Sequence, residues 1–339
     1  MKKFSLQNSK FMRLQKTSSI FVSRETAHSS LQATPPTIRP HPRIINSSFS
    51  SSTVPPHTPL SSSDFLRLES FIGRSERLFV LCGAGVSTES GIKDYRSENV
   101  GLFATTKQRP VNYSDFLNSS NVRQRYWARN TTAWPIFKSF KPNIAHRSLA
   151  TLEHLGKLHW LVTQNVDDLH HKAGSRQVTE LHGTVFSVIC LTCRQKLSRD
   201  EVQDYIFEIN PNWSATPEGF APDADVFVSE EAVRTFKTPT CRRCSGILKP
   251  DVVFFGDVIP KKRVEFVSKR LAECDAMLIA GSSIETYSAL RHVKQAKDLR
   301  VPVLILNIGR TRADPIADFI INAKCGDALT SVVEKMLKK

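Results

Sequence analysis

The chain has 339 residues, of which 40% are hydrophobic, so it can bury the core of one large or two moderate domains. Its formal net charge is +15, yet no basic stretch is interleaved with aromatic residues as in a nucleic-acid surface. No run approaches the roughly 18 unbroken apolar residues of a membrane helix. We therefore expect a globular protein that binds neither nucleic acid nor membrane and whose mature part is soluble.

Residues 1–60 differ in composition from the rest of the chain. They contain twelve Ser, six Thr and seven Pro, and eight Lys or Arg stand against one acid, Glu25. Such a segment cannot fold alone and is expected to be a disordered leader. It is either a basic tail that touches nucleic acid or an organelle transit peptide. A short basic amphipathic helix favours a transit peptide and the mitochondrial matrix; it can form from Lys3, Phe4, Leu6, Lys10, Phe11, Arg13, Leu14 and Lys16.

Ordered structure is predicted to begin at residue 61. Residues 61–64 offer caps for a helix with the apolar face Phe65, Leu68 and Ile72, which Gly73 would end. A strand over 77–82 then opens onto a glycine turn and a helix start, as in a nucleotide-binding βα unit. The same patterns predict strands at 159–163, 276–283 and 301–309, and helices at 143–155, 261–273 and 286–299. This alternation predicts an α/β fold, with a Rossmann-like parallel sheet covered by helices on both faces.

Each predicted strand ends in small or polar residues. These ends are Gly83-Ala84-Gly85, Gln164-Asn165, Gly281-Ser282-Ser283 and Asn307-Ile308-Gly309. Single residues of these types often do no more than end a strand. In open α/β sheets, however, ligands bind beyond the carboxyl ends of the strands. Because the polar run over 161–175 follows one of these ends, we expect all four to meet in one ligand-binding crevice.

The pattern changes over residues 183–255, which we assign to a small inserted module between two parts of a Rossmann-like domain, 61–182 and 256–339. Two Cys-x-x-Cys pairs, separated by 47 residues, lie in it. One pair alone would fit a redox dithiol, but two pairs fit a tetrahedral zinc with a closed, structural shell. The predicted zinc ligands are Cys190, Cys193, Cys241 and Cys244.

Two motifs are weak indicators when taken alone. The stretch "GAGVSTESGIKDYRS" (83–97) lacks the G-x-G-x-x-G spacing, although Gly83 and Gly85 would let a pyrophosphate approach the backbone and Arg96 could pair with a phosphate. A flexible loop is the alternative. His182 in "TELHGT" is either a structural histidine or a general base. His170 and His171 are alternative bases, but they are predicted to start a helix.

Several motifs together identify the chain as similar to sirtuins, the NAD-dependent protein deacylases. "GAGVSTESGIKDYRS", "TQNVDDLH", "LHGT", the paired Cys-x-x-Cys, "DVVFFGD", "GSS" and "NIG" occur in sirtuin order. Longer runs, such as "RQRYWARN", "LKPDVVFFGD" and "LNIGRTRAD", are most like the class II, mitochondrial sirtuin-four branch. The resemblance covers residues 63–330 and implies one structural zinc and NAD.

The resemblance also implies roles for individual residues. His182 matches the general base, and Asn165 and Asp167 match the motif that faces the nicotinamide ribose. The NAD-binding positions map to Gly83, Ala84, Gly85, Ser87, Thr88, Asp94, Tyr95, Arg96, Gln164, Asn165, Asp167, Gly281, Ser282, Ser283, Asn307, Ile308, Gly309 and Cys325. The substrate peptide is expected to add as a strand beside Val253, Phe254, Phe255, Gly256 and Glu285.

The implied reaction removes an acyl group from lysine on a mitochondrial protein and gives nicotinamide and O-acyl-ADP-ribose. The acyl group is left open, with lipoyl and other longer or acidic groups as candidates, and Lys107 and Arg109 could favour acidic ones. A mono-ADP-ribosyltransferase that uses the same NAD site is the main alternative, and a non-catalytic NAD-binding scaffold is another. Lys93, Asp168 and Glu285 depart from the family pattern, so turnover and substrate preference are in doubt there.

Overall fold

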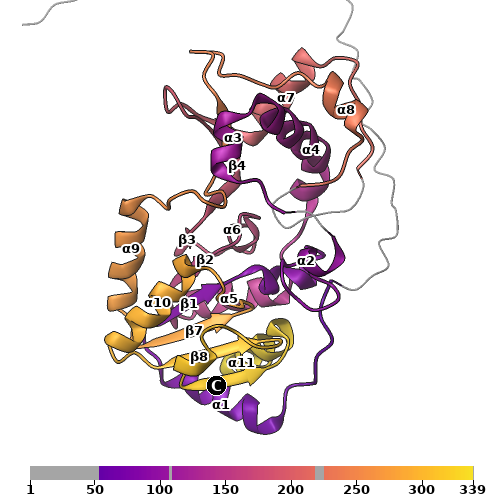
Figure 1. The fold of residues 1–339 in the computed structure, drawn as a ribbon. Helices are drawn as coiled ribbons and strands as arrows, with labels where there is room; N and C mark the ends of the chain where they lie inside the picture. Colours follow the sequence, from indigo (N-terminus) through magenta and orange to yellow (C-terminus); the bar gives the residue numbers. More distant parts are fainter. Residues whose placement is uncertain (1–52, 107–108, 218–224, 339) are drawn as a thin grey trace, which may run out of the picture. The chain divides into compact units, whose positions relative to one another are not determined.

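A six-stranded parallel sheet organises this computed structural model, which describes residues 53–106, 109–217 and 225–338 (Figure 1). The strand order is β3-β2-β1-β7-β8-β9. In chain order these strands are β1 (Leu78–Cys82), β2 (Leu158–Thr163), β3 (Val178–Glu180), β7 (Ala276–Ala280), β8 (Val303–Asn307) and β9 (Phe319–Asn322). The described residues belong to one unit of the chain, Ser50–Lys339. The predicted leader helix lies outside the described residues.

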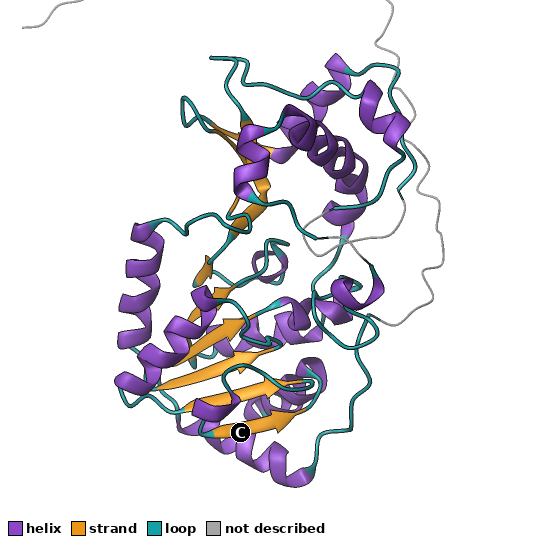
Figure 2. Ribbon diagram, viewed as in Figure 1, coloured by secondary structure: helices purple, strands orange, loops and turns teal. Residues whose placement is uncertain are grey.

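Helices cover both faces of this sheet, as the alternating pattern predicts (Figure 2). In β1 all five residues are buried because alternate side chains enter two separate cores. Leu78, Val80 and Cys82 pack with α1 (Ser62–Arg74), α5 (Ile144–His154) and α11 (Cys325–Leu337). Phe79 and Leu81 pack with α9 (Lys261–Ala272) and α10 (Tyr287–Asp298). The fold class is therefore confirmed, and α1 continues one residue past Gly73.

The strand order places a topological switch point between β1 and β7. After β1 the chain returns to the sheet as β2, which pairs with β1 on the side away from β7. After β7 it returns as β8, which pairs with β7 on the side away from β1. The connections that leave β1 and β7 therefore diverge, and ligands bind outside the carboxyl ends of strands at such a point. The turn after β1 forms a 3-10 helix, η1 (Ala84–Ser90), where the sequence predicted the start of an α-helix.

A second, antiparallel sheet has the strand order β5-β4-β6. Its strands are β4 (Gly183–Cys190), β5 (Lys196–Ser198) and β6 (Leu248–Val252). None of the helices predicted from the sequence lies between residues 183 and 255, but α7 (Arg199–Ile209) and α8 (Glu230–Thr235) form there. Both begin at a serine whose side chain accepts a backbone N–H of the first turn, a capping signal that was overlooked.

Two further helices, α3 (Tyr113–Asn118) and α4 (Ser120–Ser139), pack with this second sheet. The Trp127 indole N–H donates to the Leu248 carbonyl at 3.2 Å. The sequence did not predict α4, because its buried residues include neighbours such as Tyr126, Trp127 and Ala128 and so form no single stripe. Short elements complete the described fold: α2 (Leu102–Thr105), α6 (Leu169–Lys172) and η2 (Asp314–Ile316).

No helix within the described ranges has the length and apolar character needed to cross a membrane.

Gly183 tests the join between the two sheets. It has a φ of 81°, and a Cβ there would overlap the carbonyl oxygen of Asp251 on the neighbouring strand. Gly183→Ala should therefore lower the free energy of unfolding by at least about 2 kcal/mol, since strained backbone alone costs about 1–3 kcal/mol. Urea unfolding measures the loss.

The matched control is Gly73→Ala in α1. A Cβ at Gly73 would have no neighbour within 4 Å in the part of the chain that the structure describes. Alanine there should leave stability unchanged or raise it by up to about 1 kcal/mol, as expected for a helical glycine. Equal stability of the two variants would contradict the strained contact at Gly183.

Candidate active site

A cavity of about 810 Å³ opens at the switch point, within the range of about 300–1,000 Å³ typical of ligand pockets. The turns after β1, β2, β7 and β8 line it on one side, and residues 252–257 after β6 line it on another. All the predicted catalytic, NAD-binding and substrate-binding residues line this cavity. His170 and His171, the alternative bases, are not among its lining residues.

Two glycine turns meet at the floor of the cavity. The Gly85 N–H donates to the Gly281 carbonyl at 2.9 Å, and Gly281 has a φ of 59°. A Cβ on Gly85 would lie 2.8 Å from the Gly281 oxygen, and one on Gly83 would lie 2.7 Å from the Ser282 side chain. Side chains at these positions would push the turns apart. Their absence leaves bare main chain that a pyrophosphate can approach closely.

The polar run after β2 folds back onto η1. Ser87 donates to Asp167 Oδ2 at 2.6 Å and accepts from Asn165 Nδ2 at 3.0 Å. Asn165 also donates to the Gly83 carbonyl at 3.0 Å, which ties the run to the first glycine turn. Burial raises the pKa of Asp167, although bonds from Ser87 and the Leu169 N–H oppose that rise. These bonds hold the side chains in fixed positions at the cavity wall.

Gln164 joins β2 to the β7 turn. Its amide nitrogen donates to Ser282 Oγ at 2.8 Å and to the Cys82 carbonyl at 3.2 Å. Its amide oxygen accepts from Thr286 Oγ1 at 3.2 Å. The side chain is thereby held across the ends of β1, β2 and β7.

His182 is held at both ring nitrogens. Nδ1 lies 3.0 Å from the Gln164 carbonyl oxygen, and because that oxygen can only accept, Nδ1 carries the proton. Nε2 is then an acceptor, and Ser288 Oγ lies 3.0 Å from it. Burial lowers the pKa of His182, so the imidazole is neutral near pH 7 with a lone pair on Nε2. This is the state that a general base requires.

Sequence reasoning missed Ser288. It lies in the first turn of α10, 106 residues from its partner His182, and no local spacing links the two. Only the packing of the helix onto the sheet brings the hydroxyl to the imidazole.

The loop after η1 is held by its own side chains. Asp94 Oδ1 accepts from the N–H groups of Arg96 and Ser97, at 2.9 and 2.7 Å, and Ser97 Oγ donates to Asp94 Oδ2. Both carboxylate oxygens are therefore engaged within the loop. The Arg96 guanidinium lies over the Phe103 ring at 5.5 Å, and the Tyr95 ring meets Phe255 at 6.3 Å. The tyrosine contact connects this loop to the segment beside which the substrate peptide is expected to add.

The far end of the cavity lies beyond β8. Asn307 Nδ2 donates to the carbonyls of Ile308 and Gly309, at 3.0 and 3.1 Å, and so shapes the turn. Cys325 is the first residue of α11, and its thiol donates to the Leu306 carbonyl at 3.6 Å. Burial raises the pKa of Cys325 to about 12, so the thiol stays protonated and unreactive.

The segment after β6 bonds to the main chain of His182. The Val253 N–H donates to the His182 carbonyl at 2.7 Å. Phe254 is buried against Phe116 and Tyr126, whereas Phe255 is 42% exposed. Gly256, with a φ of 78°, turns the chain away, and Glu285 is exposed across the cavity.

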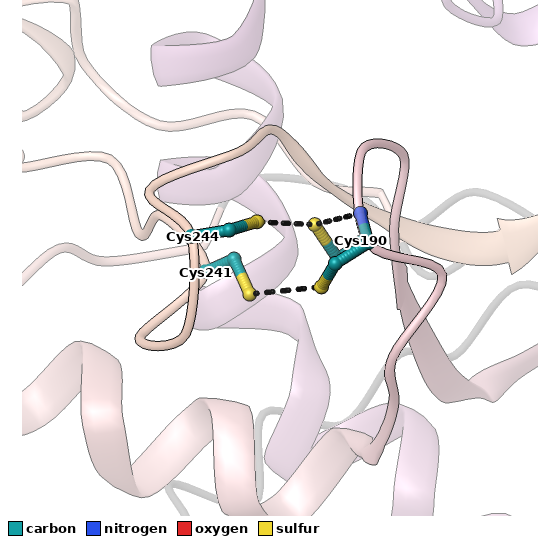
Figure 3. Close-up of side chains that lie close together, drawn as sticks. Cys190, Cys241 and Cys244 are labelled. Atoms are coloured by element: carbon teal, nitrogen blue, oxygen red, sulfur yellow. Dashed lines mark hydrogen bonds between the residues drawn. The ribbon is translucent and has the colours of Figure 1, made fainter.

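The four predicted zinc ligands converge from two turns (Figure 3). Cys190 Sγ lies 3.5 Å from Cys244 Sγ, and Cys193 Sγ lies 3.7 Å from Cys241 Sγ. Sulfurs bound at 2.3 Å around a tetrahedral zinc lie about 3.8 Å apart, so the cluster fits the ion with little movement. All four are free cysteines, and four thiolates leave no open position.

Comparisons with known proteins agree with this geometry. Residues 83–288 match the Sir2 family. The chain is 52% identical over 276 residues to NAD-dependent protein lipoamidase sirtuin-4, mitochondrial, of Bos taurus, covering 81% of this chain and 88% of that protein. It is 45% identical over 297 residues to NAD-dependent protein deacylase Sirt4 of Drosophila melanogaster, covering 86% and 95%. A solved Sir2 complex with p53 peptide and NAD+ superposes with a TM-score of 0.64 at 25% identity, covering 83% of this chain and all of that one.

Cys241→Ser tests the four-sulfur cluster. The zinc that survives dialysis should fall from about one ion per chain to near zero, because binding free energy at a structural site is also folding free energy. The thermal unfolding midpoint should fall with it. Metal analysis and calorimetry measure the two effects.

Cys274→Ser is the matched control. Its Sγ donates to the Arg270 carbonyl at 3.0 Å, a bond that a serine hydroxyl can also make, so zinc content and stability should stay near those of the unsubstituted chain. A zinc-free Cys241→Ser chain with unchanged stability would contradict a structural role for the metal.

Proposed function

The chain belongs to the Sir2 family, and from that premise we propose that it is an NAD-dependent protein lysine deacylase whose general base is His182. One observation carries the assignment. The unprotonated Nε2 of His182 lies in the same cavity as the bare glycine turns and the polar run after β2. A phosphate-binding floor, a set of hydroxyl-binding amides and a neutral base therefore line one cavity.

The residues of the cavity fit NAD. When bound, NAD supplies a ribose carbon that the acyl-lysine oxygen attacks as nicotinamide leaves. Gly83 and Gly85 leave main chain open to the diphosphate, and Asn307 shapes the turn that would face the adenosine half. Asp94, which already orders its own loop, would hold the carboxamide end.

The wall after β2 positions the ribose. Asn165 and Asp167 are held by Ser87, so the amide oxygen of Asn165 and the carboxylate of Asp167 are set in position before the ligand arrives. This preorganisation lowers the cost of orienting the reacting groups. His182 Nε2 then takes a proton from a ribose hydroxyl, and the carbonyl of Gln164 stabilises the resulting imidazolium through Nδ1.

The substrate peptide would add as a strand beside residues 253–256. Val253 already bonds to the His182 carbonyl, so a peptide aligned there places its acyl-lysine beside the base. The exposed Phe255 and Glu285 would contact side chains of the peptide.

The acyl group is proposed to be lipoyl or another long acyl chain, because a relative at 52% identity is described as a lipoamidase. Lys107, one of two residues expected to favour acidic acyl groups, lies outside the described residues. The guanidinium of the other, Arg109, lies over the Phe103 ring at 4.9 Å, the same ring that Arg96 of the cavity lining lies over. Acidic acyl groups are a second candidate on that ground.

We further propose that residues 1–60 direct the protein to the mitochondrial matrix, where its acylated protein substrates would lie. Mitochondrial names among the relatives support the organelle. The domain boundaries are proposed as 61–182 and 256–339 for the NAD-binding part and 183–255 for the zinc module. Within residues 61–182, α3 and α4 are the exception to these boundaries: they share the core of the zinc module, so we assign them to the module.

His182→Ala tests the base. Deacylation should fall by at least about a hundredfold, since general bases contribute about 10²- to 10⁴-fold, while NAD affinity should change little. The products formed by the full chain from NAD and a panel of acyl-lysine peptides are identified by mass spectrometry. His154→Ala, an exposed histidine in α5, serves as control and should keep full activity.

The same assay separates deacylation from transfer. O-acyl-ADP-ribose that appears with one acyl class supports the deacylase and names its substrate. ADP-ribose that accumulates on protein without deacylation would support the transferase instead, and full activity of His182→Ala would refute the assigned base.

Ser288→Ala tests the tautomer and basicity of His182. The Ser288 hydroxyl donates to Nε2, which stabilises the neutral imidazole and opposes its protonation. Without that bond the pKa of His182 should rise. The decline of kcat/KM on acidification should therefore begin at a higher pH in Ser288→Ala than in the unsubstituted chain. At alkaline pH, where the imidazole is neutral in both forms, the two profiles should meet.

Ser331→Ala, which removes an exposed hydroxyl from α11, is the control and should leave the profile unchanged. An acid limb that stays in place, or moves to lower pH, in Ser288→Ala would contradict the assigned hydrogen bond.

A further inference from the structure

A second group of side chains of the types that ligate metals lies outside the cavity and apart from the four cysteines. Asp168, His171 and Glu180 each offer one ligand atom, and these atoms all lie within 4.8 Å of one another. None of the three lines the proposed NAD cavity. The group is assembled from two elements, since Asp168 precedes α6, His171 lies within it and Glu180 ends β3.

The backbone is arranged to bring these side chains together. Asp168 caps α6 in a left-handed conformation, with a φ of 62°, which is uncommon for a residue other than glycine. His171 follows three residues later on the same side of the turn, and its Nδ1 lies 2.9 Å from Asp168 Oδ1. The parallel pairing of Thr163 with Glu180 then sets the third carboxylate beside them.

Glu180 carries an unsatisfied atom. Its Oε1 is buried and has no hydrogen-bond partner among the residues that the structure describes, although a buried carboxylate oxygen without one is costly. His171 and Asp168, by contrast, keep 41% and 28% of their side chains exposed, so the group is open to solvent on one side. A cation that enters from that side would give Glu180 its missing partner.

We propose that Asp168, His171 and Glu180 form a second zinc site, with water as the fourth ligand. One imidazole and two carboxylates suit zinc, whose ligand atoms lie about 3.3–3.5 Å apart in a tetrahedral shell. His171 Nδ1 and Asp168 Oδ1 lie 2.9 Å apart and would separate slightly, and rotation of the Glu180 side chain would bring in the third ligand. Binding releases the proton that His171 shares with Asp168, so that the ring nitrogen can donate its lone pair to the metal.

The site would link two parts of the active site. Asp168 directly follows Asp167, and Glu180 precedes His182 by two residues. A metal bound there joins the start of α6 to the end of β3 and restrains both segments together. Zinc is therefore expected to alter the KM for NAD, a consequence that rests on the proposed function, whereas the binding of the metal itself does not.

The test is a titration of the full chain, purified with its cysteine-bound zinc, with zinc chloride in a weakly chelating buffer. Bound metal is counted after brief gel filtration, and affinity is measured by calorimetry. The unsubstituted chain should bind one zinc more than the four cysteines hold. In His171→Gln and Asp168→Asn the affinity of the second site should fall by at least about a hundredfold, since loss of even an outer partner costs about 10- to 100-fold.

His154→Gln, an exposed histidine in α5, is the matched control and should keep the second zinc. Retention of the cysteine-bound zinc and an unchanged thermal midpoint establish that a variant is folded. Asn is chosen at residue 168 because it tolerates the left-handed conformation. The proposal is overturned if the unsubstituted chain takes up no second zinc, or if folded His171→Gln binds it with unchanged affinity. The histidine would then be only the ionic partner of Asp168.

Discussion

The backbone contact between the turns after β1 and β7 is the constraint on which the rest of the site depends. The Gly85 N–H reaches the Gly281 carbonyl only because neither turn carries side chains at the point of contact. That contact fixes the carboxyl ends of the two central strands against each other, at the place where the chain connections diverge. The floor of the cavity, the position of η1 and hence the position of Ser87 all follow from it.

A chain of hydrogen bonds starts at this floor and connects the polar residues of the cavity wall. Asn165 bonds to the Gly83 carbonyl and to Ser87, and Ser87 bonds to the buried Asp167. Burying a carboxylate is costly, and the raised pKa of Asp167 reflects that cost, which two hydrogen bonds offset in part. The cost is consistent with a functional site, where stability is commonly given up for groups held in a reactive arrangement.

The second sheet contributes position more than chemistry. The four cysteines lie at the turns beside β4 and β6. These two strands also pair at residues 183 and 252, next to the hydrogen bond from the Val253 N–H to the His182 carbonyl. A metal that holds these turns would therefore also restrain the register of the strands next to His182. The substrate peptide proposed above would add beside the segment that continues from β6, so zinc binding and substrate alignment would share one element.

Local patterns in the sequence determined the parallel sheet with its two helical layers, the four-cysteine cluster and the strand ends that line the cavity, while the resemblance to sirtuins supplied further lining residues such as Asp94 and Cys325. Buried apolar runs, glycine turns and Cys-x-x-Cys spacing each act over a few residues, so a sequence shows them directly. These patterns did not predict helix α4, because its buried residues form no stripe. They did not indicate Ser288, because its partner lies 106 residues away. Only the tertiary structure decided which hydroxyl meets His182, which carboxylate is buried and where Glu180 joins Asp168 and His171, because those contacts depend on how whole elements pack and not on neighbours along the chain.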